Sequence, residues 1–481
     1  MLPRPTSRRR FLHHSLVASA ALIAARPRWL EAAKAEGSVI DIGSRRELLV
    51  DDFLVEKLAG VALTLQKPEA RDVVLTCDAP WEGNISAYYT IFEDDGLFRA
   101  YYRAGHFDVK LRTEAHPAYT CYAESRDGLT WTKPELGLVE FNGSKANNII
   151  QVDAAAAQNF APFKDTHPAC AANARFKALA GGMTTINGKK KVCLHAYQSA
   201  EGIHWSKMTE EAAITAGSFD SQNLAFWDAA RGEYRAYWRI FSDNLRAIRT
   251  ATSKDFIHWD HQADVTYVDA PAVHLYTNAI RPYFRAPHLL IGFPTHYLVT
   301  PKEQVEPDFM TSRDAVKFHR WEEPIIPVTA PKDRGGNRSN YMVHGLLQLP
   351  GQDTELSVYA TEAYYAGVGS RVRRFVYRMD GFVSANAGAA GGTLTSKPLT
   401  FAGSKLSLNL VSKGGTRVEL QDATGQPLAG FTLEDCTPIT GDFIDHRVSW
   451  KGGDVSALAG KPVRLRIELK DAALYSLQFQ A

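Results

Sequence analysis

Residues 124–131 read ESRDGLTW, and the phrase returns as QSAEGIHW at 198–205, TSKDFIHW at 252–259 and, more weakly, TSRDAVKF at 311–318. The shared serines stand at 125, 199, 253 and 312, which gives spacings of 74, 54 and 59 residues. Such intervals suit four-stranded units with long loops, somewhat above the roughly 40–50 residues of compact repeat families. One active site has little use for four copies of the same acid. The phrase therefore predicts the outer turn of a repeated unit, with its aromatic residue packed between sheets.

Alternating aromatic and aliphatic residues precede the phrase, as in GLFRAYYRA at 96–104 and GEYRAYWRI at 232–240. This alternation, interrupted by Gly, Asp and Asn, is typical of strands. A fifth unit follows in NYMVHGLLQLPG (340–351), ELSVYATEAYYAG (355–367) and RVRRFVYRMDGFVS (371–384). Residues 40–384 thus predict a five-bladed β-propeller, and we expect RRELLVDDFLVE at 45–56 to supply the strand that closes the ring.

After Ser384 the composition changes to the small-residue linker ANAGAAGG. Short strand patterns such as KLSLNLV, TRVELQD and VRLRIELK follow at regular spacing, separated by Gly-rich turns. Residues 392–481 therefore predict a C-terminal β-sandwich. The predicted fold class is all-β, a five-bladed β-propeller followed by a β-sandwich.

The first 35 residues have the pattern of a twin-arginine signal peptide. Ser7-Arg8-Arg9-Arg10-Phe11-Leu12 precedes the apolar run SLVASAALIAA and a small-x-small site, Ala33-Lys34-Ala35. We expect a periplasmic or secreted protein with no stable membrane span after cleavage. Loss of the leader, which holds seven Lys and Arg and one Glu, changes the formal net charge from +2 to −4. A mildly acidic chain gives no electrostatic footprint for nucleic acid.

Other chemistries lack their sequence patterns. The five cysteines form no C-x-x-C pair and no Cys/His metal spacing, and their odd number leaves at least one free or paired between chains. There is no G-x-S-x-G, P-loop, H-E-x-x-H or helix-opening GxGxxG. We predict no cofactor. A structural divalent cation in the central channel would be compatible with the fold, yet no ligand spacing predicts one.

Several runs resemble a group of exported bacterial proteins with the five-bladed β-propeller fold of glycoside hydrolases, the superfamily of invertase-like fructosidases, arabinosidases and xylosidases: LLVDDFLVE (48–56), DAPWEGN (78–84), HLYTNAIRPYF (274–284), DFMTSRDAVKFHRW (308–321) and LYSLQF (474–479). The order of propeller and sandwich is most similar to the invertase group. The resemblance implies an exported hydrolase that cleaves an oligo- or polysaccharide with two carboxylic acids in the funnel.

Four acids are candidates for that chemistry. In DAPWEGN, Asp78 or Glu82 could be base or nucleophile, and we favour Glu82 because Trp81 could pack on a sugar face. The resemblance suggests Asp165 as transition-state stabiliser, although Lys164 replaces the family's Arg. Asp220 or Glu362 would be the acid. The alternatives are tight turns at Asp78 and Glu82, a turn cap at Asp165, and a core salt bridge from Glu362 to Arg338 or Arg371.

Polar side chains near these acids are the predicted substrate-binding residues: Asp78, Trp81, Asn84, His167, Asn223, Asn278, Arg281, Arg338 and Asn340. Carboxylates and amides make directional hydrogen bonds to sugar hydroxyls. A propeller that binds carbohydrate without cleaving it is the alternative function. Fold alone does not decide between the two.

Overall fold

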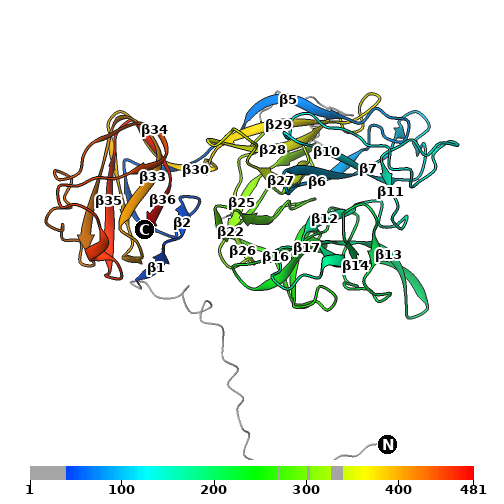
Figure 1. The fold of residues 1–481 in the computed structure, drawn as a ribbon, viewed down its shortest axis with the longest axis horizontal. Coiled ribbons are helices and arrows are strands. Elements are labelled where there is room, and N and C mark those ends of the chain that lie inside the picture. The colour runs from blue at the N-terminus through cyan, green and yellow to red at the C-terminus, as the bar shows by residue number, and fades with distance from the viewer. Residues whose placement is uncertain (1–38, 269, 301–303, 327–339) are drawn as a thin grey trace, which may run out of the picture.

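The computed structural model describes residues 39–268, 270–300, 304–326 and 340–481. This part of the chain contains no α-helix; its elements are strands and two short 3-10 turns at Ala172–Ala174 and Ser456–Leu458. Figure 1 shows a propeller body and a second body in which β1 and β2 lie among the C-terminal strands. The predicted signal peptide and Arg338 lie outside the described residues.

Antiparallel pairing divides the propeller strands into five groups. We number them sheets 1 to 5. Sheet 1 contains β6 (Ala87–Asp94), β7 (Leu97–Ala104), β10 (Tyr119–Ser125) and β11 (Ile149–Ile150); sheet 2 contains β12 (Ala161–Lys164), β13 (Phe176–Ile186), β14 (Lys189–Ser199) and β15 (Ser206–Lys207); sheet 3 contains β16 (Leu224–Asp228), β17 (Glu233–Ser242), β18 (Leu245–Ser253) and β19 (Asp260–Asp264).

Sheet 4 contains β20 (Thr266–Val268), β21 (Arg281–Tyr283), β22 (Ala286–Gly292), β25 (Phe309–Ser312) and β26 (Lys317–Trp321), and sheet 5 contains β5 (Glu69–Thr76), β27 (Met342–Leu347), β28 (Glu355–Glu362) and β29 (Arg371–Arg378). Two small hairpins extend from the sheets: β8 (Phe107–Asp108) with β9 (Thr113–Glu114), and β23 (Thr295–Leu298) with β24 (Gln304–Pro307). The count of five blades stays our interpretation of this pairing.

The first strands of the sheets approach one another near the ring axis. β27 pairs with β6 in parallel through His344 and Thr90. From sheet 3, the buried Gln222 amide donates to the carbonyl of Tyr89 at 3.0 Å and to Thr90 Oγ1 at 3.1 Å. We call the end of the ring where these first strands begin the mouth, and the end where they finish the base.

The repeated phrase forms the same turn four times, as predicted. The turns follow β10, β14, β18 and β25, and in every copy the serine Oγ accepts the N–H of the residue three positions on at 2.8 Å. That residue has φ between 69° and 87°, a left-handed conformation that explains Gly128 and Gly202. Trp205 packs on Phe160 at 4.9 Å and on Tyr101 of sheet 1 at 6.3 Å, so this aromatic residue does lie between sheets.

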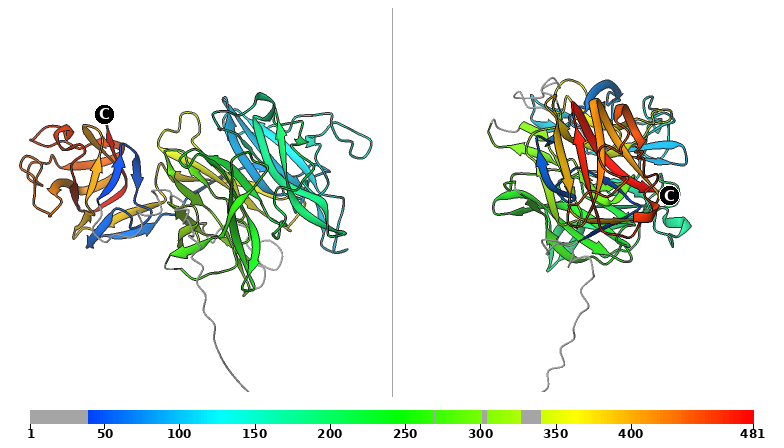
Figure 2. Two further views of the ribbon diagram at one scale, coloured as in Figure 1. Left: turned by 90° about the horizontal axis from the view of Figure 1, so that it is seen from below. Right: turned by 90° about the vertical axis from the view of Figure 1, so that its left-hand side faces the viewer.

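The second body combines both ends of the chain in one sheet, as Figure 2 also shows. Its N-terminal strands are β1 (Ile40–Gly43), β2 (Arg46–Leu48), β3 (Val55–Ala59) and β4 (Ala62–Leu65), and its C-terminal strands are β30 (Val383–Ala387), β31 (Gly392–Ser396), β32 (Leu399–Phe401), β33 (Lys405–Asp422), β34 (Ile439–Arg447), β35 (Val463–Leu469) and β36 (Ala472–Gln480). A core of Leu, Ile, Val and Phe fills this body. Its sandwich architecture stays a prediction.

The closing strand differs from the one we predicted. Residues 46–48 pair with β36 and residues 55–59 with β31, so the 45–56 segment belongs to the second body. Instead β5 pairs antiparallel with β29, from Thr76 opposite Arg371 to Glu69 opposite Val376. The prediction failed because the acids of 45–56 have their partners at the junction between the bodies.

A buried ion pair joins the two bodies. Arg313, from the fourth copy of the turn, donates to Glu47 Oε2 at 2.8 Å and to Asp51 Oδ2 at 2.7 Å. The Glu47 side chain is fully buried, which by itself would raise its pKa. Arg313, His288 and Arg45 outweigh burial and lower the pKa of Glu47 from 4.5 to about 2.

Acid should therefore weaken the protein through Glu47. A carboxyl whose pKa is lowered in the folded state contributes stability above pH 4.5 and loses it as the pH falls toward 2. The contribution is about 3 kcal/mol. Urea denaturation of Arg313→Ala at neutral pH should show a loss of about 3–5 kcal/mol, because Glu47 stays buried without its main partner. Arg45→Ala, which removes a more exposed partner of the same carboxylate, should cost under about 1 kcal/mol; equal losses in the two variants would contradict this account.

Candidate functional site at the propeller mouth

Six tyrosines gather at the mouth from three parts of the ring: Tyr88, Tyr276, Tyr297, Tyr341, Tyr364 and Tyr365. Neighbouring rings lie 4.6–6.4 Å apart between centroids, mostly edge to face. Tyr88 and Tyr365 have φ of 58° and 60°, which is unusual for bulky residues. Strained backbone of this kind clusters at functional sites, and here it occurs at two members of the ring cluster.

Three arginines pack on these rings. The guanidinium carbon of Arg103 lies 4.7 Å from the Tyr88 centroid, that of Arg239 lies 4.6 Å from Tyr276, and that of Arg246 lies 4.4 Å from Tyr297. Cation–π contact holds the charged groups against the aromatic surface. We call these six tyrosines and three arginines the mouth cluster.

Buried amides lie where the first strands begin. Within the described part of the chain, Gln222 Oε1, Asn223 Oδ1, both amide atoms of Asn340 and His344 Nδ1 have no hydrogen-bond partner. Burial and the nearby Arg281 lower the pKa of His344 to about 3, so this ring stays neutral. Buried polar atoms without partners are rare, and here they leave donors and acceptors for a ligand or water.

Among the four candidate acids, Asp220 is the one exposed at the mouth. Its side chain is 73% exposed, and Oδ2 lies 3.7 Å from Arg239 and accepts a long 3.5 Å hydrogen bond from the Tyr276 hydroxyl. The residue precedes β16, the first strand of sheet 3. Asp220 is therefore the predicted acid that joins the mouth cluster.

Glu82 lies buried between sheet 1 and β5. Its carboxylate is fully buried, accepting from Lys133 Nζ at 2.6 Å, from the Tyr102 hydroxyl at 2.6 Å and from the Ala79 N–H at 3.0 Å. The last bond spans the tight turn that we weighed as its alternative. Trp81 donates to Asn148 at 2.7 Å within the same network. Both carboxylate oxygens of Glu82 thus have internal partners.

Asp165 lies at the base, because β12 ends at Lys164 immediately before it. It accepts from Lys177, from the Tyr234 hydroxyl at 2.7 Å and from the His167 N–H at 2.9 Å. Burial opposes ionisation, but the bonds from Lys177 and Tyr234 bring the pKa of Asp165 below its ordinary value. Asp94 and Asp228 also end first strands and pair with basic residues, so Asp165 occupies a repeated position.

Glu362 ends β28 and is completely buried. It pairs with Arg373 and lies 3.4 Å from Arg371. This is the core salt bridge that we weighed as its alternative, with Arg371 as one partner. The structure thus gives the four acids four separate sets of partners.

The predicted binding residues divide between the two ends of the ring. Five of them stand at the mouth, at or just before first strands: Asn84, Asn223, Asn278, Arg281 and Asn340. His167 lies at the base, where it contacts Trp227 edge to face and stacks on Tyr234. Asp78 is 66% exposed, 3.6 Å from Lys133. Of the mouth amides, Asn84 is bound to the backbone of Phe107 and Asn278 accepts from the Ile280 N–H.

Sequence reasoning missed the arginines, although a signal was present. GLFRAYYRA and GEYRAYWRI align residue for residue, which equates Arg99 with Arg235 and Arg103 with Arg239. The first pair turns to the base, where Arg99 lies 3.1 Å from Asp94 and Arg235 lies 3.7 Å from Asp228. The second pair turns to the mouth. The two arginines of each segment are four residues apart and so share one face of the sheet; their roles differ because they lie near opposite ends of the strand.

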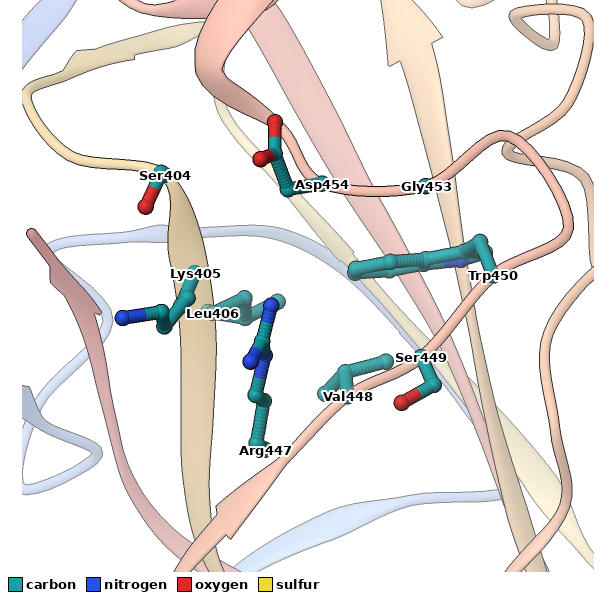
Figure 3. A pocket seen from close by; sticks show the side chains of 9 residues that line it. All are labelled: Ser404, Lys405, Leu406, Arg447, Val448, Ser449, Trp450, Gly453 and Asp454. Carbon is teal, nitrogen blue, oxygen red and sulfur yellow. The ribbon is translucent and has the colours of Figure 1, made fainter.

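The C-terminal body has a surface hollow of its own (Figure 3). This hollow of about 250 Å³ is lined by Lys405, Arg447, Trp450 and Asp454, among others. Across the described ranges there is no cluster of three or more His, Cys, Asp or Glu side chains suited to a metal ion. The same ranges contain no helix with the length and hydropathy needed to cross a bilayer.

Neither the family models nor the curated proteins compared with this sequence give a match. Solved structures do. A thermostable family-43 glycoside hydrolase is 11% identical (TM-score 0.40; 64% of this chain, 95% of that one), and an endo-arabinase from Bacteroides thetaiotaomicron is 10% identical (TM-score 0.39; 65% and 99%). An N-acetylgalactosamine deacetylase from F. plautii is 13% identical (TM-score 0.43; 67% and 96%). Likeness at this level carries no information on ligand or chemistry.

Replacing Glu82 should test whether it is structural. Glu82→Gln leaves the half-buried Lys133 without its charge partner, and we expect urea denaturation to show a loss of about 2–4 kcal/mol. Asp78→Asn is the matched control, because this exposed acid faces the same ammonium group and should cost under about 1 kcal/mol. A Glu82→Gln protein with unchanged stability but abolished activity would instead assign Glu82 to catalysis.

Proposed function

We propose that the protein binds a saccharide at the mouth of its propeller. The observation that carries this proposal is the mouth cluster itself, in which three buried and three half-buried tyrosine rings stand beside arginines and buried amides. Aromatic faces pack against the C–H faces of sugars, and amide and guanidinium groups hydrogen-bond to hydroxyls. A site that combines both is typical of carbohydrate recognition.

Glycosidic hydrolysis is the second proposal, because it needs two carboxylic groups around the scissile bond. Asp220 offers one carboxylate beside Tyr276 and Arg239. Glu82, Asp165 and Glu362 are engaged in buried pairs with Lys133, Lys177 and Arg373. Binding is therefore the better supported function, and Asp220 is the acid on which hydrolysis would depend.

Retention in native gels that contain single polysaccharides, together with assays of released reducing ends, tests both proposals. Tyr276→Ala should lower retention by the bound polysaccharide at least tenfold, because the ring joins Tyr297, Tyr341 and two arginines. Phe284→Ala, an exposed aromatic residue at the base, is the matched control and should bind normally. No retention by any polysaccharide would refute the proposal.

Asp220→Asn separates binding from cleavage. If the protein is a hydrolase that uses this acid, the variant should keep its retention and lose at least about 100-fold in reducing-end release, the usual weight of a positioned acid or base. If the unmodified protein is retained by a polysaccharide but releases no reducing ends from it, binding without cleavage is its function.

We further propose export through the twin-arginine route, on the strength of residues 1–35. Replacing Arg8 and Arg9 with Lys should leave the uncleaved protein in the cytoplasmic fraction of a bacterial host, because that route reads the arginine pair. Normal export of the double variant would contradict the proposal.

A further inference from the structure

Arg239 and Arg246 of the mouth cluster have no buried carboxylate partner among the residues that the structure describes. Arg246 is half-buried, its Nε is enclosed without a hydrogen-bond partner, and its guanidinium makes no ion pair with any residue that the structure describes. It packs against aromatic rings alone: Tyr297 at 4.4 Å, Tyr276 at 5.4 Å and Phe241 at 5.7 Å. A guanidinium taken out of water needs anionic or carbonyl acceptors to offset the lost hydration.

A second arginine shares the same rings. The guanidinium carbon of Arg239 lies 4.6 Å from the Tyr276 centroid and 5.7 Å from that of Phe241. It donates to the backbone and hydroxyl oxygens of Ser218 at 3.2 Å, and its nearest carboxylate, Asp220, is 3.7 Å away and largely in solvent. Two like charges are therefore held around common rings, with one exposed acid beside Arg239.

The base provides an internal comparison. In the same nine-residue segments, Arg99 and Arg235 have buried Asp94 and Asp228 as carboxylate neighbours. Arg103, the mouth counterpart of Arg239, donates to the Ile85 carbonyl at 2.9 Å and to the Tyr364 hydroxyl at 2.7 Å. In these two segments, the arginines at the base therefore have a buried carboxylate neighbour, whereas those at the mouth have none within the described ranges.

The histidines near these arginines add no further positive charge. Burial and then Arg246 lower the pKa of His274, and burial with Arg320 lowers that of His296 to about 4, so both rings are neutral at physiological pH. Arg281, at the start of β21, is also half-buried, and burial lowers its pKa to about 10. Among the described residues, Arg239, Arg246 and Arg281 therefore place positive charge at the mouth beside the aromatic rings.

We propose that the saccharide bound at the mouth carries an anionic group, a uronic acid carboxylate or a sulfate ester, which Arg246 and Arg239 hold together. The planar guanidinium donates two parallel hydrogen bonds to such an oxyanion, while Tyr276 and Tyr297 are placed to contact the sugar ring. This inference rests on the proposed saccharide binding and adds the substrate class.

The test measures binding of the full mature protein to three matched glycans: an oligogalacturonate, a sulfated galactan oligosaccharide and a neutral galactan. We expect tighter binding to at least one acidic glycan than to the neutral one, weakening as salt is raised, and the preferred acidic glycan identifies carboxylate or sulfate. Arg246→Ala should weaken that binding at least tenfold, and Arg246→Lys should recover part of it.

Arg447→Ala is the control, because this exposed arginine lies beside Trp450 in the C-terminal hollow (Figure 3) and offers similar chemistry. Loss of acidic-glycan binding in Arg447→Ala but not in Arg246→Ala would overturn the inference. Binding of the neutral galactan alone, with no effect of Arg246→Ala, would also overturn the inference of an anionic group. In that case the proposed saccharide binding would stand. A protein that binds no glycan would refute both.

Discussion

Closure of the ring by β5 is the constraint on which the rest of the structure depends. This strand is contributed by residues 69–76, whereas its partner β29 lies some 300 residues later in the chain. β1–β4 precede β5 and pair with the C-terminal strands, so the two bodies are joined on both sides of the closure. Asp380 reinforces the junction, accepting from Tyr283 at 2.5 Å and from Ser476 at 2.8 Å, with Arg285 Nε as an ion-pair partner 3.0 Å away. Closure of the ring keeps the N-terminal ends of the first strands close together, and these ends form the mouth.

The two ends of the ring use the same residue types for different purposes. At the base, acids that end the first strands bind arginines and lysines of the same or the next sheet: Asp94 binds Lys164 and Arg175, and Asp228 binds Arg231. The two acids are buried, and their basic partners offset the cost of removing the carboxylates from water. At the mouth, tyrosines replace the acids as partners of arginine. A tyrosine face stabilises the cation without neutralising it, so the charge stays available to a ligand.

The sequence was a good guide where the information is local. The Ser-x-Asp turn and the alternating strands predicted the repeated sheets, because both depend on residues within eight positions of one another. It was a poor guide to the acids, since their partners are distant: Lys133 lies 51 residues from Glu82, and Tyr234 lies 69 residues from Asp165. An acid flanked by aromatic residues gives the same sequence pattern in a ligand site and in a buried pair with lysine. Aligning the second strands of sheets 1 and 3 pairs Arg103 with Arg239, whereas Arg246 lies on the next strand, β18, outside that alignment.

The pairing of β1 with β32, and of β2 with β36, has a consequence for the order in which the molecule is made. The ribosome releases residues 40–65 first, yet their strand partners lie within residues 383–480, the last to emerge. The first strands synthesised must therefore wait, unpaired and with apolar side chains such as Leu48 and Leu54 exposed, until translation is complete. Sheets 1 to 4 can assemble meanwhile from neighbouring hairpins. The closing step joins the two ends of the chain, and loop-closure entropy makes such long-range pairing slow. Between synthesis and ring closure, the unpaired strands of residues 40–65 are therefore the part of the chain most exposed to pairing with other chains.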